Sequence, residues 1–255
     1  MDTLVLKEEN TLKIDKENSE KKIEVISHTL SSLYIERIKD NTSLFFDLKE
    51  GSSLKLSIFV YEEVKNLKID VEVAKNASIS IYFADFSSCF NSSEVVINLN
   101  EDGANAHWHL ASLSSKEDRK NISISVYHKA MNTYGKVDNY GVAKDQSKLV
   151  FSGTSHILNG AIKSSTQQNA KIMVFDPESD AMAKPILKID ENDIEASHSA
   201  AVGKISDEEI FYLTSRGLNE EQAKMLITLG YLKPIFKGFN ENQINMMNEI
   251  IEKRL

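Results

Sequence analysis

The sequence predicts a mainly β protein: a body of many short strands followed by a small α-helical domain. Apolar and polar residues alternate along segments throughout residues 4–189, which is typical of half-buried strands because successive side chains face opposite sides. No stretch with helical spacing separates these segments. After Ile205 the spacing becomes helical. We therefore expect a β core over residues 1–205 and a helical domain over residues 206–255.

The alternating segments give the positions of the expected strands. The clearest are residues 54–60, 67–73, 78–83, 95–99, 122–126 and 171–175. Tight hairpins favour glycine, and the chain has only 10 Gly and 3 Pro, so wide corners fit the connections at least as well. No clean repeat is visible, and these observations alone leave a β-sandwich and a β-solenoid both open. Residues 136–142, which are polar and glycine-containing, predict a corner or a bulge.

Three helices are predicted after the β core. Capping boxes begin at Ser206, Asn219 and Asn240, each with Glu or Gln three residues later. Gly217, Gly230 and Gly238 stand where helix C-caps need a left-handed residue. A unit of this size buries little surface alone, so we expect it to pack on the β core or on a partner.

Composition restricts the class of protein. The net charge of −8 argues against a general nucleic-acid binder, and no apolar run approaches the roughly 20 residues that span a bilayer. The first ten residues lack the apolar centre of a signal peptide, so we expect a cytoplasmic protein. Cys89 is the only cysteine, which excludes an internal disulfide, and we expect it to be a small buried side chain.

Histidines are the main candidates for chemistry. His198 lies in a small, polar segment just before the first helix, and its residues alone favour a structural, hydrogen-bonded imidazole. His107 and His109 fall on one strand face with Trp108 on the other, but no third metal ligand is evident nearby. We expect His128 and His156 to face solvent or a subunit interface. No catalytic triad, paired carboxylates or phosphate loop is present, so we expect no enzyme activity.

Four stretches in the second half of the chain resemble the SufD family of scaffold subunits, which belong to the SUF iron–sulfur cluster assembly machinery. The stretches are Lys148–Gly153, Ala161–Asn169, Pro185–Ile189 and Ala196–Gly217. The chain resembles a short form, without the N-terminal helical domain usual in that family. The resemblance implies a right-handed parallel β-helix, followed by a C-terminal helical domain that docks SufC, an ABC-type ATPase. It also implies pairing with SufB, a second β-helix subunit, along a shared edge.

The resemblance also implies roles for particular residues. The histidine that matches His198 lies at the SufB interface and is implicated in cluster assembly, which makes His198 a tentative metal ligand. Ala196 stands where many relatives have Cys and Ser199 where glycine is frequent, so a supporting role for His198 becomes more plausible. The implied ATPase-docking candidates are Arg216, Met225, Leu229, Tyr231 and Phe236, and for the last four a place in the core is the alternative. For Arg216, complementing the helix C-terminus is the alternative. Leu226 is expected in the core.

The expected function is therefore that of a non-catalytic scaffold that binds no cofactor stably and shares a transient cluster across a subunit interface. Its expected partners are a SufC-like ATPase and a SufB-like subunit. One alternative keeps the family but pairs the chain with a second copy of itself. Another, from a different class, is a β-helix enzyme that acts on polysaccharide.

Overall fold

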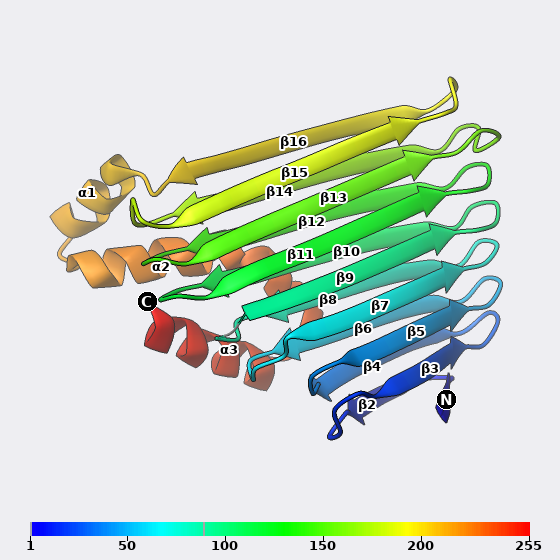
Figure 1. Cartoon of the computed structure of the whole chain (residues 1–255), viewed down its shortest axis with the longest axis horizontal. Helices are drawn as coiled ribbons and strands as arrows, with labels where there is room; N and C mark the ends of the chain where they lie inside the picture. The colour runs from blue at the N-terminus through cyan, green and yellow to red at the C-terminus, as the bar shows by residue number, and fades with distance from the viewer. Residues whose placement is uncertain (1, 89) are drawn as a thin grey trace.

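Two parallel sheets face each other across the interior of the protein (Figure 1). This computed structural model describes residues 2–88 and 90–255; Cys89, expected to be buried, lies outside the described residues. Sheet A contains the odd-numbered strands: β1 (Asp2–Leu6), β3 (Glu20–Val25), β5 (Thr42–Leu48), β7 (Asn66–Val73), β9 (Phe90–Leu99), β11 (Arg119–His128), β13 (Lys148–Ile157) and β15 (Asp180–Ile189). Sheet B contains the even-numbered strands: β2 (Glu9–Lys13), β4 (Leu30–Arg37), β6 (Ser53–Val60), β8 (Ser78–Asp85), β10 (Asn105–Ser114), β12 (Tyr134–Ala143), β14 (Ser165–Val174) and β16 (Glu195–Lys204).

Each coil of the protein consists of one strand of sheet A and the next strand of sheet B. Strands two apart in sequence pair in parallel, so the chain climbs along one axis in a right-handed sense (Figure 1). The prediction of a right-handed parallel β-helix is confirmed. The β-sandwich, which the alternation alone could not exclude, is wrong.

The interior is built from rows of inward side chains in register. One row runs up sheet A from Ile23 through Phe46, Val71, Ile97 and Val126, and every side chain in it is buried. Burial alternates along the strands because only every second side chain points inward. Stacked rows of this kind give the coils one continuous apolar core.

The coils grow longer from the N-terminal end to the C-terminal end. Paired residues of sheet B differ in number by 23 (Leu30 and Ser53), 25 (Ser53 and Ser78), 27 (Ser78 and Asn105) and 29 (Asn105 and Tyr134). Strands lengthen from 5 residues in β1 to 10 in β15, and the solenoid widens in Figure 1. This taper explains why the sequence shows no repeat of constant period.

The turns that join sheet A to sheet B repeat one backbone feature. A residue with positive φ occurs in the six of these turns that lie between β3 and β14, at His28, Gly51, Asn76, Gly103, Asn132 and Lys163. Each donates its N–H to a carbonyl of the next coil, as Asn76 does to Asp102 at 3.0 Å. Glycine and asparagine adopt this conformation at low cost, which explains how so few glycines suffice.

Four helical segments follow the solenoid: α1 (Asp207–Ser215), α2 (Glu220–Leu232), the 3₁₀ helix η1 (Lys233–Gly238) and α3 (Glu241–Arg254). Asn219 and Asn240 form complete capping boxes, and the Ser206 side chain accepts a hydrogen bond from the Glu209 N–H. Gly217 has φ +97°, as expected of a C-cap. The same expectation is wrong for the other two glycines, since Gly230 lies inside α2 and Gly238 ends η1, both without positive φ.

The helices pack on the outer face of sheet B. Outward side chains such as Phe59, Ala111 and Met173 join Leu232 and Met247 in a second apolar cluster. Arg254 at the end of α3 pairs with the Asp118 carboxylate and donates to the Phe86 carbonyl. The expectation that these helices would pack on the β core is therefore met. None of the described helices has the length and hydrophobicity needed to cross a membrane.

Two further expectations about the solenoid are wrong. Residues 136–142 lie inside β12, where pairing with β10 and β14 is continuous, and they form neither a corner nor a bulge. His128 is fully buried, because it follows Ile122, Ile124 and Val126 at even spacing and therefore faces inward with them.

Candidate functional site

The C-terminal end of the solenoid is uncovered. In the described chain β15 pairs only with β13, and β16 only with β14, so each is an edge strand. Every residue of β16 is exposed, whereas burial in β14, directly below it, alternates with the pleat over most of its length. In β15 the inward side chains Ala181, Ala183, Pro185 and Leu187 are only half-buried. The last coil thus presents its inner face and two bare strand edges to solvent.

His198 lies in the middle of this end. It is paired with Gln168, whose side chain is buried, so the His198 imidazole belongs to the inward-facing row. Beneath it, the Gln168 Nε2 donates to the Ser155 hydroxyl at 2.7 Å and to the Ile186 carbonyl at 3.1 Å. Thr166 also donates to Ser155, at 2.9 Å. His198 therefore stands over a polar floor.

A second polar row fixes the outer face of β16. The Ser199 hydroxyl donates to the Asn169 Oδ1 at 2.8 Å, and the Asn169 Nδ2 donates to the Asp138 carboxylate at 2.9 Å. Lys136 forms an ion pair with the same carboxylate at 3.1 Å. This row ties the edge strand to the two strands below it through side chains as well as through the backbone.

His107 and His109 lie together on the outer face of sheet B, with Trp108 buried on the opposite face as expected. The His109 ring stacks on Tyr82 with 4.7 Å between centroids, and its Nδ1 lies 3.7 Å from Asp138. Burial lowers the pKa of both histidines. No group of three His, Cys, Asp or Glu in the described part of the chain is arranged to hold a metal ion.

The two remaining strand histidines differ from each other. His156 is half-buried on the outer face of sheet A, where its Nε2 lies 2.7 Å from the Asp190 carboxylate. His128 is enclosed, its Nδ1 is 2.9 Å from the Thr133 hydroxyl, and burial lowers its pKa to about 4. Neither lies on β16 near His198.

The predicted partner-binding residues of the helical segment lie mainly at its contact with the solenoid. Met225, Leu229, Tyr231 and Phe236 are half-buried and pack against the second apolar cluster. Tyr231 meets Tyr140 edge-on, with 5.8 Å between ring centroids. Arg216 caps α1, and its guanidinium lies over the Tyr212 ring at 5.0 Å.

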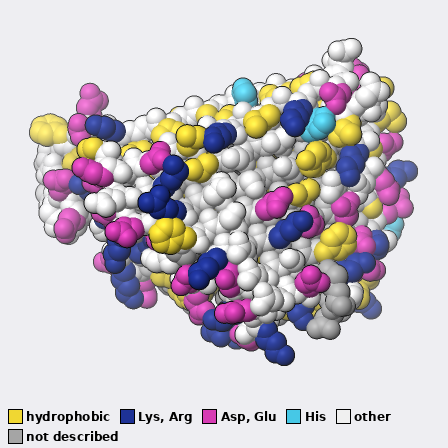
Figure 2. Space-filling model, in the orientation of Figure 1, with side chains coloured by type: hydrophobic (Ala, Val, Ile, Leu, Met, Phe, Trp, Pro, Cys, Tyr) yellow, Lys and Arg dark blue, Asp and Glu magenta, His cyan; other side chains and the backbone are white. Residues whose placement is uncertain are grey.

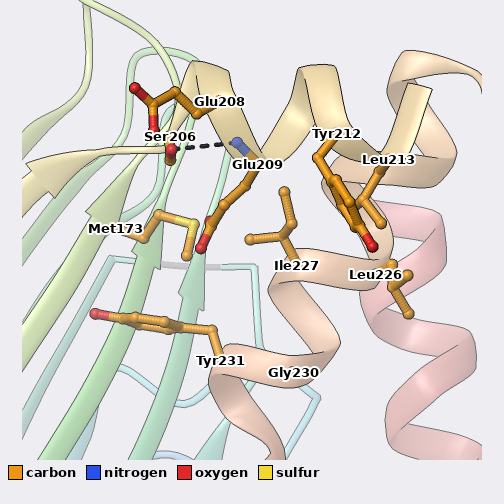
Figure 3. A pocket seen from close by; sticks show the side chains of 10 residues that line it. All are labelled: Met173, Ser206, Glu208, Glu209, Tyr212, Leu213, Leu226, Ile227, Gly230 and Tyr231. Carbon is orange, nitrogen blue, oxygen red and sulfur yellow. Dashed lines mark hydrogen bonds between the residues drawn. The ribbon is translucent and has the colours of Figure 1, made fainter. Parts of the chain in front are cut away.

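A groove with a volume of about 740 Å³ lies between α1, α2 and the end of β14 (Figure 3). Tyr212, Leu226 and Ile227 supply much of its apolar lining, and Glu208 and Glu209 lie at one end. Tyr212 is 56% exposed and Leu226 51%, and Phe211 next to Tyr212 is 74% exposed. The expectation that Leu226 is a core residue is wrong.

Sequence reasoning overlooked Phe211 and Tyr212, although a signal was present. Ile210 packs against the second cluster, and Leu213, three residues later, lies on the same helical face. Phe211 and Tyr212 fall between them and cannot share that face. Two adjacent large aromatic residues that do not lie on the packed face of their helix predict an exposed apolar surface.

Comparison with known families finds a match over residues 9–231 to the family described as "SUF system FeS cluster assembly, SufBD core domain". The iron–sulfur cluster assembly protein SufD of Bacillus subtilis is 32% identical over 143 residues, which are 56% of this chain and 33% of that protein. An iron–sulfur cluster assembly SufBD family protein of Staphylococcus saprophyticus is 28% identical over 151 residues, 59% of this chain and 32% of that protein. The matched region is thus about a third of each of these relatives.

Proposed function

The chain belongs to the SufBD core family of the SUF system, which assembles iron–sulfur clusters, and on that premise we propose that it is a non-catalytic scaffold subunit. It pairs with a second β-helix subunit, either SufB-like or a copy of itself, and docks a SufC-like ABC-type ATPase. It acts in the cytoplasm. The cluster is its cargo and not a resident cofactor.

The observation that carries this proposal is the open terminal coil with His198 at its centre. A sheet edge with unpaired N–H and C=O groups is a template for another strand, and monomeric proteins usually cover or interrupt it. Here both edges are bare, and the side chains of β16 are small apart from His198, Val202 and the terminal Glu195 and Lys204. These features favour a surface that another subunit covers.

The arrangement supports a shared, transient cluster site. A neutral imidazole can ligate iron, but His198 is the only His or Cys on β16, and Ala196 occupies the position where relatives often have Cys. A cluster held here therefore takes its remaining ligands from the partner subunit. Separation of the subunits would then release it.

The helical segment is the proposed ATPase-docking region. The chain has no phosphate-binding loop of its own, so ATP hydrolysis belongs to a partner. Tyr212 and Leu226 line the groove and are about half exposed, with Glu208 and Glu209 at its end, and Phe211, which precedes Tyr212 on α1, is 74% exposed. Exposed aromatic and aliphatic side chains around a hollow are typical of protein interaction sites. We therefore add these three residues to the docking candidates Arg216, Met225, Leu229, Tyr231 and Phe236.

The test is affinity purification of the tagged chain from its own cells, with the recovered proteins identified by mass. We expect an ABC-type ATPase, and we expect Phe211→Asp/Leu226→Asp to lose it. Leu30→Asp is the matched control, since Leu30 is an 83% exposed leucine on an N-terminal coil. Recovery of no ATPase by the unmodified chain would overturn the proposal, and equal loss in the control would refute the assignment of the docking surface.

A further inference from the structure

The helical segment is not held on the solenoid evenly along its length. Helices α2 and α3 and the 3₁₀ helix between them bury side chains in the second apolar cluster, among them Leu232, Ile235 and Met247. Helix α1 has no buried residue, and its Ile210 reaches that cluster only half-buried. It lies beyond the end of β16 (Figure 1), and Figure 2 shows hydrophobic, acidic and basic side chains together on the surface of that end of the molecule.

Strand β16, which precedes α1, has equally little contact with the core. All ten of its residues are exposed. Among residues 174–222, all of which the structure describes, Ile205 is the only buried one. The Ile205 N–H also donates to the Val174 carbonyl at 3.0 Å, just beyond the end of β16. Segments with few buried apolar contacts are those that open locally at the lowest free energy. We therefore expect β16 and α1 to open more readily than the strands and helices beside them.

No flexible linker separates β16 from α1. The strand ends at Lys204 and the helix begins at Asp207, and both residues between them are fixed. Ile205 is bonded to β14, and the Ser206 hydroxyl caps α1 by accepting a hydrogen bond from the Glu209 N–H at 3.3 Å. Because the cap directly follows the last bond to β14, loss of this end of the ladder also releases the start of α1. The two elements should therefore separate from the body together.

The other end of α1 allows it to move without α2. Gly217 has φ +97°, and a Cβ there would meet nothing within 4 Å, so this part of the backbone is not packed. Asn219 then begins α2 with its own complete capping box. The groove of about 740 Å³ lies between α1 and α2, with Tyr212 on one side and Leu226 on the other (Figure 3). Movement of α1 thus breaks no closely packed helix interface.

We propose that residues 195–218, here called the terminal strap, open from the rest of the protein as one cooperative unit, while α2, η1 and α3 stay on sheet B. The strap carries both His198 and Tyr212, so the last sheet edge and the groove are complete only in the closed form. The open form presents β14 as the edge strand and uncovers the Gln168 side chain that lies beneath His198. This opening belongs to the isolated chain and does not depend on the proposed partners.

Amide exchange of the isolated chain at increasing urea concentrations tests the cooperativity of the strap. The Glu195 and Ile205 N–H groups donate to β14, so the odd-numbered amides between them face β14 as well. We expect the amides of Ser199, Ala201 and Ile210 to share one free energy of opening and one urea dependence, both lower than those of β14 and α3. Different values for β16 and α1, or opening of β16 only together with β14, would overturn the proposal.

Two proline variants of α1 form a matched pair. Phe211→Pro interrupts the helix at a 74% exposed side chain, so little packing is lost with the ring. If the strap is one unit, the β16 amides of Ser199 and Ala201 should exchange at least about tenfold faster in this variant. Asp207→Pro places proline at the first helical position, where it is tolerated, and should leave these rates unchanged.

The amides of β14 and α3 report on the rest of the fold in both variants, and their exchange should not change. If Phe211→Pro leaves the β16 amides as slow as in the unmodified chain, α1 and β16 open separately and the proposal is wrong. Faster exchange throughout β14 and α3 would also contradict it, because the strap would then not be separable from the body.

Discussion

Lys120 and Asp85 form an ion pair of 2.8 Å in which neither side chain is exposed to solvent. The Lys120 ammonium also donates to the backbone carbonyls of Asp85 and Leu113, and Asp85 accepts from Ser87 and Asn91. Burial alone would raise the pKa of Asp85, but the Lys120 charge and these hydrogen bonds hold it below its usual value. The pair therefore lies charged inside the solenoid wall, close to the two groups that Arg254 of α3 contacts: Phe86 follows Asp85, and Asp118 precedes Lys120 by two residues.

Removing one partner of this pair should be costly. Lys120→Met leaves the Asp85 carboxylate buried without its counter-charge, and we expect the free energy of unfolding in urea to fall by about 3–5 kcal/mol. The double variant Lys120→Met/Asp85→Leu removes both charges and should be destabilised by less than the sum of the two single variants. Additive effects would show that the two charges are not coupled.

His128 should make stability depend on pH. Its folded-state pKa of about 4 lies below the ordinary value of 6.5, so the unfolded chain binds a proton that the folded chain does not. Stability is therefore complete above pH 6.5 and falls as the pH drops from 6.5 towards 4, by up to about 3 kcal/mol at 1.36 kcal/mol per pKa unit. Urea unfolding at several pH values measures how steeply the free energy of unfolding changes with pH between 4 and 6.5. In His128→Gln this slope should correspond to the uptake of one proton fewer on unfolding. An imidazole resonance of His128 that titrates near 6.5 would contradict the prediction.

The contact between η1 and sheet B should tolerate no added methyl group. A Cβ at Gly238 would lie 2.3 Å from the Tyr82 Cβ, so Gly238→Ala must displace η1 or the strand, and we expect a loss of about 1–3 kcal/mol. Gly230→Ala is the matched control, because Gly230 lies in the last turn of α2 and a Cβ there meets nothing within 4 Å. It should stabilise the protein by up to about 1 kcal/mol. Thermal unfolding of both variants gives the comparison, and a neutral Gly238→Ala would count against the close contact.

The Asn169 side chain should stabilise the pairing of the edge strand β16 with β14. Asn169→Leu removes its bonds to Asp138 and Ser199, each worth about 1 kcal/mol. The amides of Ser197, Ser199 and Ala201, which face β14, should then exchange roughly tenfold faster, since 1.4 kcal/mol corresponds to a factor of ten. Asn121→Leu, at an exposed asparagine on the outer face of sheet A, should leave these rates unchanged. If these amides exchange at equal rates in the two variants, the backbone hydrogen bonds to β14 alone stabilise β16.

Much of the solenoid could be predicted from period-two alternation, because each inward row is apolar over several coils. Segments 54–60 and 78–83 fall within β6 and β8. The burial of His128 was also present in the pattern, as the fourth member of an even-spaced row that begins at Ile122. Because histidine is polar, its place in this row did not suggest burial, although the Thr133 hydroxyl supplies the hydrogen-bond partner that a buried imidazole needs.

Other features depend on contacts between distant segments and could not be predicted in this way. β16 has no apolar alternation, because neither of its faces is covered. The face that α2 turns to the solenoid depends on where sheet B lies, so the exposure of Leu226 could not be predicted from spacing within the helix.

The taper of the solenoid has a consequence for self-association. A β-solenoid of constant coil length can stack head to tail, since its last coil matches its first, and such contacts repeat without limit into fibres. Here the strands of the first coil have 5 residues and those of the last have 10, so a copy stacked head to tail would leave half of each edge unpaired. The progressive lengthening of the coils thus limits growth along the axis. An exposed β edge can serve assembly in this protein without offering a template for polymerisation.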